Sequence, residues 1–314
     1  MPKEKKSAMI KRYRGKKNKR KGKERMDNGI TTEYIETLMI SPDRQMGVYL
    51  VNQRGRKSVL KIRFDSKISK QKTFEEYNMM QQFKTCEYIM YTTGIVYVDH
   101  PGVDEGVYAL SMPYAEGNTL LDFLKGKPRN AISEKQFVYY ALQMCKALLT
   151  SHNWSVCHRD ISLENWLFMD SKHSHLVLSD WEFAIDMSKY NSTDGKLYKQ
   201  CGKHQYASPQ LLSKDGYSGF KTDIWSLGVC YFSMLTGNPL HNERTSPRIL
   251  EETKGNSVKK RLFQVTKDTD LIHLISTMLH PLEARRPSTW YIMQKLCEIK
   301  LKLARQAKMI HFLE

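Results

Sequence analysis

Alternating apolar and polar residues dominate the first part of the chain after a polar opening stretch. Short runs of β-branched or alternating apolar residues, bounded by turn-forming residues, are typical of strands. Five such runs predict strands at residues 35–40, 47–52, 58–64, 94–100 and 107–112. Between the third and the fourth run, residues 72–84 carry apolar side chains at every third or fourth position, which predicts a helix.

After residue 120 the apolar spacing becomes mainly helical. Ser133 and Gln136 form a capping-box pair, which predicts a helix that continues to His152. The apolar run at 223–235 predicts a helix that is buried on all sides. The other elements expected here are strands at 167–169 and 176–178 and helices at 246–265, 268–280 and 287–308.

The composition is that of a globular protein with room for one large domain or two small ones. The 314 residues are 40% hydrophobic and 26% charged. No apolar run reaches the roughly 18 residues that a membrane span requires, and the opening residues do not resemble a secretory signal. The six cysteines include no Cys-x-x-Cys pair, so we expect buried free thiols in a reducing compartment. These features favour an intracellular protein, nuclear or cytoplasmic.

The net charge of +17 is concentrated at the start of the chain. Residues 3–25 contain thirteen Lys and Arg and two Glu, a net charge of +11. Because the segment has few apolar residues to offset its ordering entropy, we expect residues 1–27 to form a disordered arm. Its basic run has three possible roles. It fits a nuclear-import signal that binds an importin, or a segment that binds nucleic acid, and the alternative is a solubilising tail.

Candidate chemistry lies between residues 157 and 182. His158, Arg159 and Asp160 are followed by Asn165, and Asp180 comes twenty residues after Asp160. A carboxylate that orients a hydroxyl, together with oxygen ligands for Mg²⁺, is what phosphoryl transfer requires. The alternative is a polar turn between two short strands.

A lysine within an apolar strand is a second candidate for chemistry. Lys61 lies between Leu60 and Ile62, and burying its charge is costly unless the ammonium finds an anion. The alternative is a half-exposed strand with Lys61 on its solvent face.

These motifs, in this order, resemble the eukaryotic protein kinase family over residues 34–305. The resemblance implies an α+β, two-lobed fold, with a small β-rich lobe at 28–113 and a larger helical lobe at 114–314. It implies ATP and Mg²⁺ as cofactors, with Asp160 as the catalytic base and Asn165 and Asp180 as metal ligands. It also places Lys61 at the α- and β-phosphates. Glu76 is expected to pair with that lysine, and Glu75 is the alternative.

The resemblance further implies an adenine pocket, with Met112 at its back. The resemblance implies that the other residues that bind ATP are Ile40, Val48, Val59, Pro113, Tyr114, Ala115 and Leu167. Lys61 and Asp180 would lie at the phosphates. The family's glycine-rich loop is degenerate here, because its glycine positions hold Ser41, Asp43 and Met46. Side chains there are expected to keep the backbone away from the phosphates.

Further departures affect positioning and regulation. Trp181 and Glu182 replace the family's Phe-Gly after the metal-binding aspartate, and Glu182 is either a solvated side chain or another Mg²⁺ ligand. Gln210 replaces a glutamate that normally pairs with the arginine at Arg286, so we expect a weakened contact. Serine/threonine kinases usually carry a lysine two residues after the catalytic aspartate, and the family has a threonine in the activation segment. This chain has Ser162 and Lys203 at those positions.

The leading functional prediction is a protein kinase, with serine/threonine specificity on base rates, that acts as a monomer on protein substrates. The alternatives are a pseudokinase that serves as a scaffold or allosteric partner, and a small-molecule kinase of the choline or aminoglycoside type. In the activation segment, Ser192, Thr193 and Tyr198 are candidate phosphorylation sites, and Arg159 would receive the phosphate.

Overall fold

The computed structural model describes residues 23–25, 31–41, 45–53, 55–98, 106–128, 131–213, 215–241 and 257–313. Contacts within the chain divide it into two compact units. The first comprises the residues up to Tyr77 together with Thr92–Tyr114, and the second comprises Asn78–Tyr91 and the residues from Ala115 onward.

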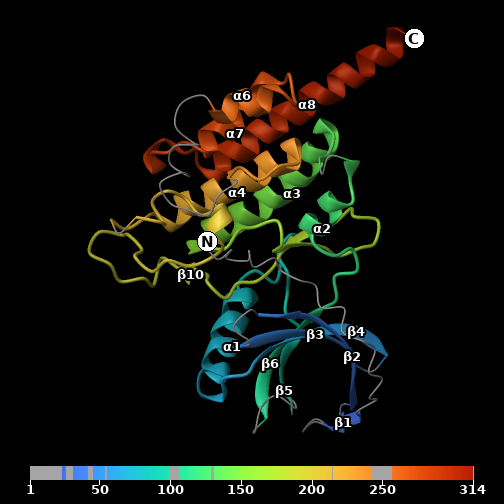
Figure 1. The fold of residues 1–314 in the computed structure, drawn as a ribbon, viewed down its shortest axis with the longest axis vertical. Coiled ribbons are helices and arrows are strands. Elements are labelled where there is room, and N and C mark those ends of the chain that lie inside the picture. Colours follow the sequence, from blue (N-terminus) through green and yellow to red (C-terminus); the bar gives the residue numbers. More distant parts are fainter. Residues whose placement is uncertain are drawn as a thin grey trace, which may run out of the picture. The chain divides into compact units, whose positions relative to one another are not determined.

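The first unit is built on one antiparallel sheet of six strands, in the order β1-β2-β3-β4-β6-β5 (Figure 1). The strands are β1 (Lys23–Arg25), β2 (Thr31–Ile40), β3 (Met46–Gln53), β4 (Arg56–Arg63), β5 (Gly94–Val98) and β6 (Val107–Pro113). The five strands predicted from the apolar runs are confirmed, with shifted ends. Beyond them, Lys23–Arg25, expected to belong to a disordered arm, form β1 because their backbone pairs with the edge of β2. The rest of the arm lies outside the described residues, as does Asp43.

One face of this sheet carries an apolar core. Its buried members are Tyr49, Val51, Leu60, Ile62, Val98, Val107 and Ala109. Helix α1 (Ser66–Gln81) packs beside β6, where the Thr73 hydroxyl donates to the Tyr108 carbonyl at 3.3 Å and the Phe74 ring meets the Tyr108 ring edge-on. The helix begins six residues before the predicted start, because its first turns are polar and give little periodic signal.

The second unit is mainly helical. Its helices are α2 (Leu120–Lys125), α3 (Glu134–Asn153), α4 (Gly219–Thr236), α6 (Ser257–Phe263), α7 (Thr269–Met278) and α8 (Thr289–Leu313), with short 3₁₀ turns η2 (His204–Tyr206) and η3 (Glu283–Arg285). Two strand pairs, β7 (Val156–Cys157) with β10 (Ile185–Asp186) and β8 (Trp166–Phe168) with β9 (Leu176–Leu178), flank the loops that carry the candidate chemistry.

Local sequence signals explain the two central helices. The Ser133 hydroxyl accepts from the Gln136 backbone N–H at 3.3 Å, so the predicted cap of α3 is confirmed. Helix α4 is buried along almost its whole length, as its continuous apolar run predicts, and it ends at Gly237 in the left-handed conformation. Helix α3 packs against α4 and α8 (Figure 1). The expected helix at 246–265 falls partly outside the described residues, and α6 is its described part.

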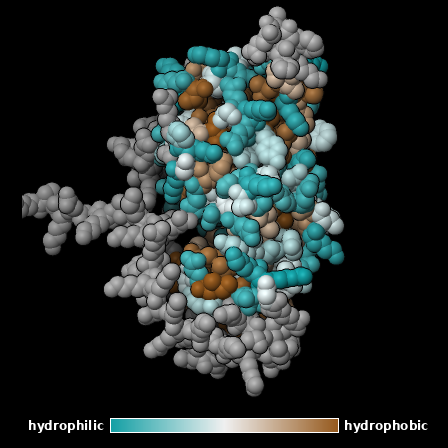
Figure 2. Space-filling view, turned by 90° about the vertical axis from the view of Figure 1, so that its right-hand side faces the viewer, coloured by the Kyte–Doolittle hydropathy of each residue, from teal (hydrophilic) through white to brown (hydrophobic). Residues whose placement is uncertain are grey.

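The described surface is mixed in character. On the face drawn in Figure 2, hydrophobic areas are separated by hydrophilic residues. Among the described helices, none combines the length and the apolar character that would let it cross a membrane. All six cysteines are free thiols, and Cys145, Cys157 and Cys230 are buried.

Candidate active site

A buried ion-pair cluster lies on β4 and α1 in the first unit. Lys61 Nζ donates to Glu76 Oε1 at 2.9 Å, and Arg63 Nη2 donates to Glu76 Oε2 at 2.7 Å. The three side chains are at most 6% exposed. Glu75, the alternative partner for Lys61, is exposed and accepts from Gln71 instead. The structure therefore pairs Lys61 with Glu76.

Arg63 is a member of this cluster that the sequence reading missed. It lies two residues after Lys61 on the same strand, so both side chains point to the same face of the sheet. The sequence could have indicated Arg63, because it is a second basic residue two positions after Lys61 in the same predicted strand.

Strand register brings three of the predicted adenine-pocket residues to this same face. Residues paired directly across antiparallel strands share a face. Val48 pairs with Lys61, and Val59 pairs with Met112. Ile40 departs from the expectation: it pairs with Gly47, while Met39 stands across from Val48. Register thus places Ile40 on the opposite face and Met39 on the face of Val48.

The other predicted adenine-pocket residues lie at the end of β6 or later in the chain. Pro113 is the last residue of β6, Tyr114 ends the first unit and Ala115 begins the next segment of the second. Leu167 is half-buried on β8. Two hydrogen bonds join Ser41 and Met46, which hold two of the glycine positions of the family's loop. The Ser41 backbone N–H donates to the Met46 carbonyl, and the Ser41 hydroxyl accepts from the Met46 N–H.

Helix α4 fixes the backbone of the loop that contains Asp160. The fully buried carboxylate of Asp223 accepts from the backbone N–H groups of His158 and Arg159, both at 2.8 Å. His152 Nε2 contacts the same carboxylate at 3.1 Å. Arg159 adopts a φ of 66°, a conformation that costs a non-glycine residue energy and is maintained here by these contacts.

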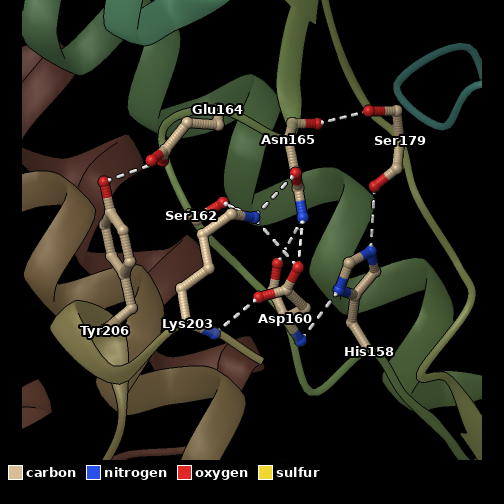
Figure 3. Close-up of polar contacts among 8 residues, drawn as sticks. All are labelled: His158, Asp160, Ser162, Glu164, Asn165, Ser179, Lys203 and Tyr206. Carbon is tan, nitrogen blue, oxygen red and sulfur yellow. Dashed lines mark hydrogen bonds and ion pairs between the residues drawn. The ribbon is translucent and has the colours of Figure 1, made fainter. Parts of the chain in front are cut away.

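Asp160 is the centre of a polar network in the second unit (Figure 3). Its Oδ2 accepts from Asn165 Nδ2 at 2.9 Å and from Lys203 Nζ at 3.0 Å, and its Oδ1 accepts from the Lys203 backbone N–H at 3.0 Å. Asn165 Nδ2 also donates to the Asp160 carbonyl at 2.7 Å. The carboxylate is therefore held in one orientation by groups from two segments.

His158 braces this loop as a neutral imidazole. Its Nδ1 accepts from the Asp160 backbone N–H at 3.3 Å, so its Nε2 carries the proton and donates to the Ser179 carbonyl at 3.1 Å. Complete burial lowers the pKa of His158 below its usual value, although neighbouring carboxylates, first Asp223, oppose the shift. The neutral form matches the donor and acceptor roles seen in the structure.

The loop of Asp180 is joined to Asn165 through the residue before it. Ser179 donates from both its backbone N–H and its hydroxyl to the Asn165 carbonyl, each at 2.9 Å. Asp180 itself has a φ of 67°. An amide oxygen and a carboxylate are hard ligands that suit Mg²⁺, which keeps water and phosphate oxygens as its remaining ligands. The described residues contain no cluster of three or more His, Cys, Asp or Glu arranged for a metal.

Trp181 is buried between aromatic rings. Its ring is 1% exposed and packs against Phe83 at 4.6 Å and against His158 at 4.7 Å between centroids. Glu182, the next residue, is half-buried.

Polar contacts hold the activation segment (residues 186–204) and the residues beside it. Arg159 Nε donates to the Phe183 carbonyl at 2.7 Å, and its Nη1 donates to the Tyr217 hydroxyl at 3.3 Å. Asp194 accepts from the Tyr198 hydroxyl, the Lys196 backbone N–H and the Ser192 hydroxyl. These bonds, the largest effect first, lower the pKa of Asp194 to about 2. A phosphate that reached Arg159 would have to displace some of these contacts.

Gln210 keeps a hydrogen bond to Arg286. Arg286 Nη2 donates to Gln210 Oε1 at 2.5 Å, and Gln210 Nε2 donates to the Pro281 carbonyl at 2.6 Å. Burial lowers the pKa of Arg286 to about 9. The amide serves both neighbours, because it supplies an acceptor and a donor where a carboxylate would supply acceptors alone.

A two-unit α+β chain with a lysine–glutamate pair and this aspartate network has the features of a phosphotransferase. The sequence profile of the protein kinase domain matches residues 47–298, and the chain belongs to that family.

Relatives of the chain include several serine/threonine kinases. It is 28% identical to CBL-interacting protein kinase 11 of Oryza sativa subsp. japonica, over 88% of this chain and 49% of the relative. It is 35% identical to CBL-interacting serine/threonine-protein kinase 15 of Arabidopsis thaliana, over 40% of this chain and 28% of the relative. Serine/threonine-protein kinase SRK2F of Arabidopsis thaliana is 32% identical, over 46% of this chain and 40% of the relative. The match thus spans less than half the length of each of these relatives.

Proposed function

We propose that this chain is an active serine/threonine protein kinase that transfers the γ-phosphate of ATP to a protein hydroxyl. The observation that carries the proposal is the fixed orientation of Asp160, whose two carboxylate oxygens accept from Asn165 and Lys203. A base held in one orientation lowers the entropic cost of reaching the transition state. The family match and the names of the relatives favour a protein hydroxyl over a small molecule as the acceptor.

Each residue has a role that its surroundings support. Asp160 would accept a hydrogen bond from the substrate hydroxyl and orient it toward the γ-phosphate. Lys61, held by Glu76, would neutralise charge on the α- and β-phosphates. Asn165 and Asp180 would hold Mg²⁺, which when bound supplies positive charge to the phosphate oxygens. Val48, Val59 and Met112 offer an apolar face to the adenine ring.

A pseudokinase is the second candidate, and one observation favours it. Lys203 Nζ pairs with the carboxylate of Asp160 and also donates to Asn165 Oδ1, the oxygen expected to bind the metal. If the contact with Asn165 Oδ1 persisted when nucleotide was present, it would keep that oxygen from the metal.

The deciding experiment measures transfer of labelled γ-phosphate from ATP to a generic basic protein and to the chain itself. We expect wild-type transfer with Mg²⁺, and a loss of about 10²–10⁴-fold in the Asp160→Asn variant. The matched control is Asp215→Asn, which changes an exposed aspartate of the same unit. Nucleotide binding without transfer in the wild type would favour the pseudokinase.

The basic arm has a separate proposed role in nuclear import, which depends on sequence alone. Deleting residues 1–22 should shift a fluorescently tagged chain toward the cytoplasm without changing phosphotransfer. An unchanged distribution would contradict the import role.

A further inference from the structure

Lys203 makes a three-way contact inside the catalytic loop. Its Nζ donates to Asp160 Oδ2 at 3.0 Å, to Ser162 Oγ at 2.9 Å and to Asn165 Oδ1 at 3.1 Å (Figure 3). An ammonium has three N–H donors, and here each has an acceptor on the loop. The side chain is 33% exposed, and its ammonium is directed toward these three acceptors on the loop.

The backbone beside Lys203 is fixed against the same loop. The Lys203 N–H donates to Asp160 Oδ1 at 3.0 Å. Gly202 has a φ of 78°, and a Cβ at this position would lie 2.5 Å from the Arg159 carbonyl and 3.0 Å from Asp160 Oδ1. Only glycine permits so close an approach in this conformation. The ammonium is therefore brought to Asp160 by a built contact between two segments.

We propose that Lys203 is a catalytic residue that supplies the cation for the transferred phosphoryl group, in place of the lysine that serine/threonine kinases carry at the position of Ser162. Compared with those kinases, the hydroxyl residue (Ser162) lies on the catalytic loop and the lysine (Lys203) lies on the activation segment. Lys203 Nζ is 2.9 Å from Ser162 Oγ. This inference rests on the proposed function, because it takes Asp160 as the group that orients the substrate hydroxyl.

The charge requirement of the reaction supports this role. The substrate hydroxyl oxygen, next to Asp160, forms a bond to the γ-phosphorus of ATP while the bond from that phosphorus to the β-phosphate oxygen breaks. ADP leaves, and the hydroxyl proton passes to Asp160. Nζ of Lys203 lies 3.0 Å from that carboxylate. Negative charge on the phosphoryl oxygens is stabilised by a cation that is already in position. One N–H can turn from the neutral Ser162 hydroxyl or Asn165 amide to a phosphoryl oxygen, while the ionic bond to Asp160 is kept.

The contact also leaves Asp160 able to act. Among the described residues, Oδ2 accepts two hydrogen bonds and Oδ1 accepts one. Because each carboxylate oxygen can accept two, Oδ1 has a position left for the substrate hydroxyl.

The test restores the family's arrangement, with lysine at position 162 and threonine at position 203. We compare Lys203→Thr, Ser162→Lys and the double variant Ser162→Lys/Lys203→Thr with the wild type. The matched control is Lys199→Thr, which makes the same change at an exposed lysine of the same segment. Two measurements are made on each protein: steady-state kinetics with a basic protein substrate, and calorimetric affinities for Mg²⁺ with ADP and for Mg²⁺ with an ATP analogue that has an imido β–γ bridge.

We expect Lys203→Thr to lower kcat about a hundredfold, with a smaller effect on the KM for ATP, because the contact is stronger in the transition state. We expect its ratio of ATP-analogue to ADP affinity to fall about tenfold, since only the analogue carries a γ-phosphate to receive the charged hydrogen bond. The double variant should recover kcat at least about tenfold over Lys203→Thr, as residues that act as a pair require. Lys199→Thr should remain within about twofold of the wild type.

Other outcomes would overturn the inference. Wild-type kcat and a wild-type affinity ratio in a folded Lys203→Thr protein would show that the ammonium takes no part in the reaction. Raised kcat in that variant would show that Lys203 blocks the base. If the wild type binds nucleotide but transfers no phosphate, the proposed function fails, and the affinity ratio alone then decides whether Lys203 contacts the γ-phosphate. If the wild type binds no nucleotide, both proposals fail.

Discussion

Glu76 stands between two buried cations, with its Oε1 2.9 Å from Lys61 Nζ and its Oε2 2.7 Å from Arg63 Nη2. Removing one partner of a buried ion pair leaves an uncompensated charge in a low-dielectric region. Glu76→Ala would leave two such charges close together on β4. We expect it to lower the free energy of unfolding by about 3–5 kcal/mol, measured by urea denaturation.

The control for this prediction is the neighbouring glutamate. Glu75 is exposed and contacts Gln71 on its own helix, so Glu75→Ala should change the free energy of unfolding by less than about 0.5 kcal/mol. Equal effects of the two substitutions would mean that the cluster around Glu76 does not form in solution.

Gly202 offers a test of how closely the activation segment approaches the catalytic loop. Gly202→Ala would place a methyl group 2.5 Å from the Arg159 carbonyl and would also strain a backbone with a φ of 78°. Gly195→Ala meets a similar backbone conformation, with a φ of 68°, but open space around the added methyl. The backbone cost should be about 1–2 kcal/mol for both substitutions.

The clash should appear only at position 202. We expect Gly202→Ala to lower phosphotransfer at least about tenfold, because displacement of the segment moves Lys203 away from Asp160. Gly195→Ala should keep wild-type transfer. Equal kinetics in the two variants, measured with the same basic protein substrate, would argue against a close approach at Gly202.

Arg286 tests the contact that replaces the family's glutamate–arginine pair. Its guanidinium donates to Gln210, to the His280 carbonyl and to the Lys221 carbonyl. Lysine cannot reproduce this planar arrangement of donors. Arg286→Lys should therefore lower the free energy of unfolding by about 1–3 kcal/mol. Arg285→Lys, at the adjacent exposed arginine, should leave it nearly unchanged, and a similar loss in both would contradict the role of Arg286.

His158 should make stability depend on pH. Burial lowers its pKa in the folded state, whereas the unfolded chain titrates near 6.5. As pH falls below about 6.5, the unfolded state binds a proton that the folded state does not, so the free energy of unfolding decreases by up to about 1.4 kcal/mol per pH unit. Above that pH the contribution is fully present.

The measurement compares urea denaturation at several pH values between 5 and 7.5. His158→Asn should lose the part of the pH dependence that belongs to this imidazole, while His273→Gln, at an exposed histidine of α7, should retain the wild-type dependence. The same slope in His158→Asn and in the wild type would contradict a neutral, buried His158.

Much of the fold could be predicted from local patterns, because those patterns reflect local physical requirements. Alternating apolar residues such as those of β3 and β4 can bury one face only as strands. The uninterrupted apolar run of α4 requires a helix surrounded by protein. The resemblance to the family depended on several motifs in the right order, among them Lys61 and the spacing of Asp160, Asn165 and Asp180.

Other features depended on segments that are distant in the sequence. The choice of Glu76 over Glu75 depends on the face that α1 turns toward β4, and the position of Ile40 depends on strand register. The approach of Lys203 to Asp160 joins residues 43 positions apart, through a glycine conformation that no local pattern specifies. The sequence by itself determined which side chains are candidates for the chemistry, because residue type and spacing are local properties. Only the tertiary structure decided which of them meet, because pairing a buried charge depends on how the whole backbone folds around it.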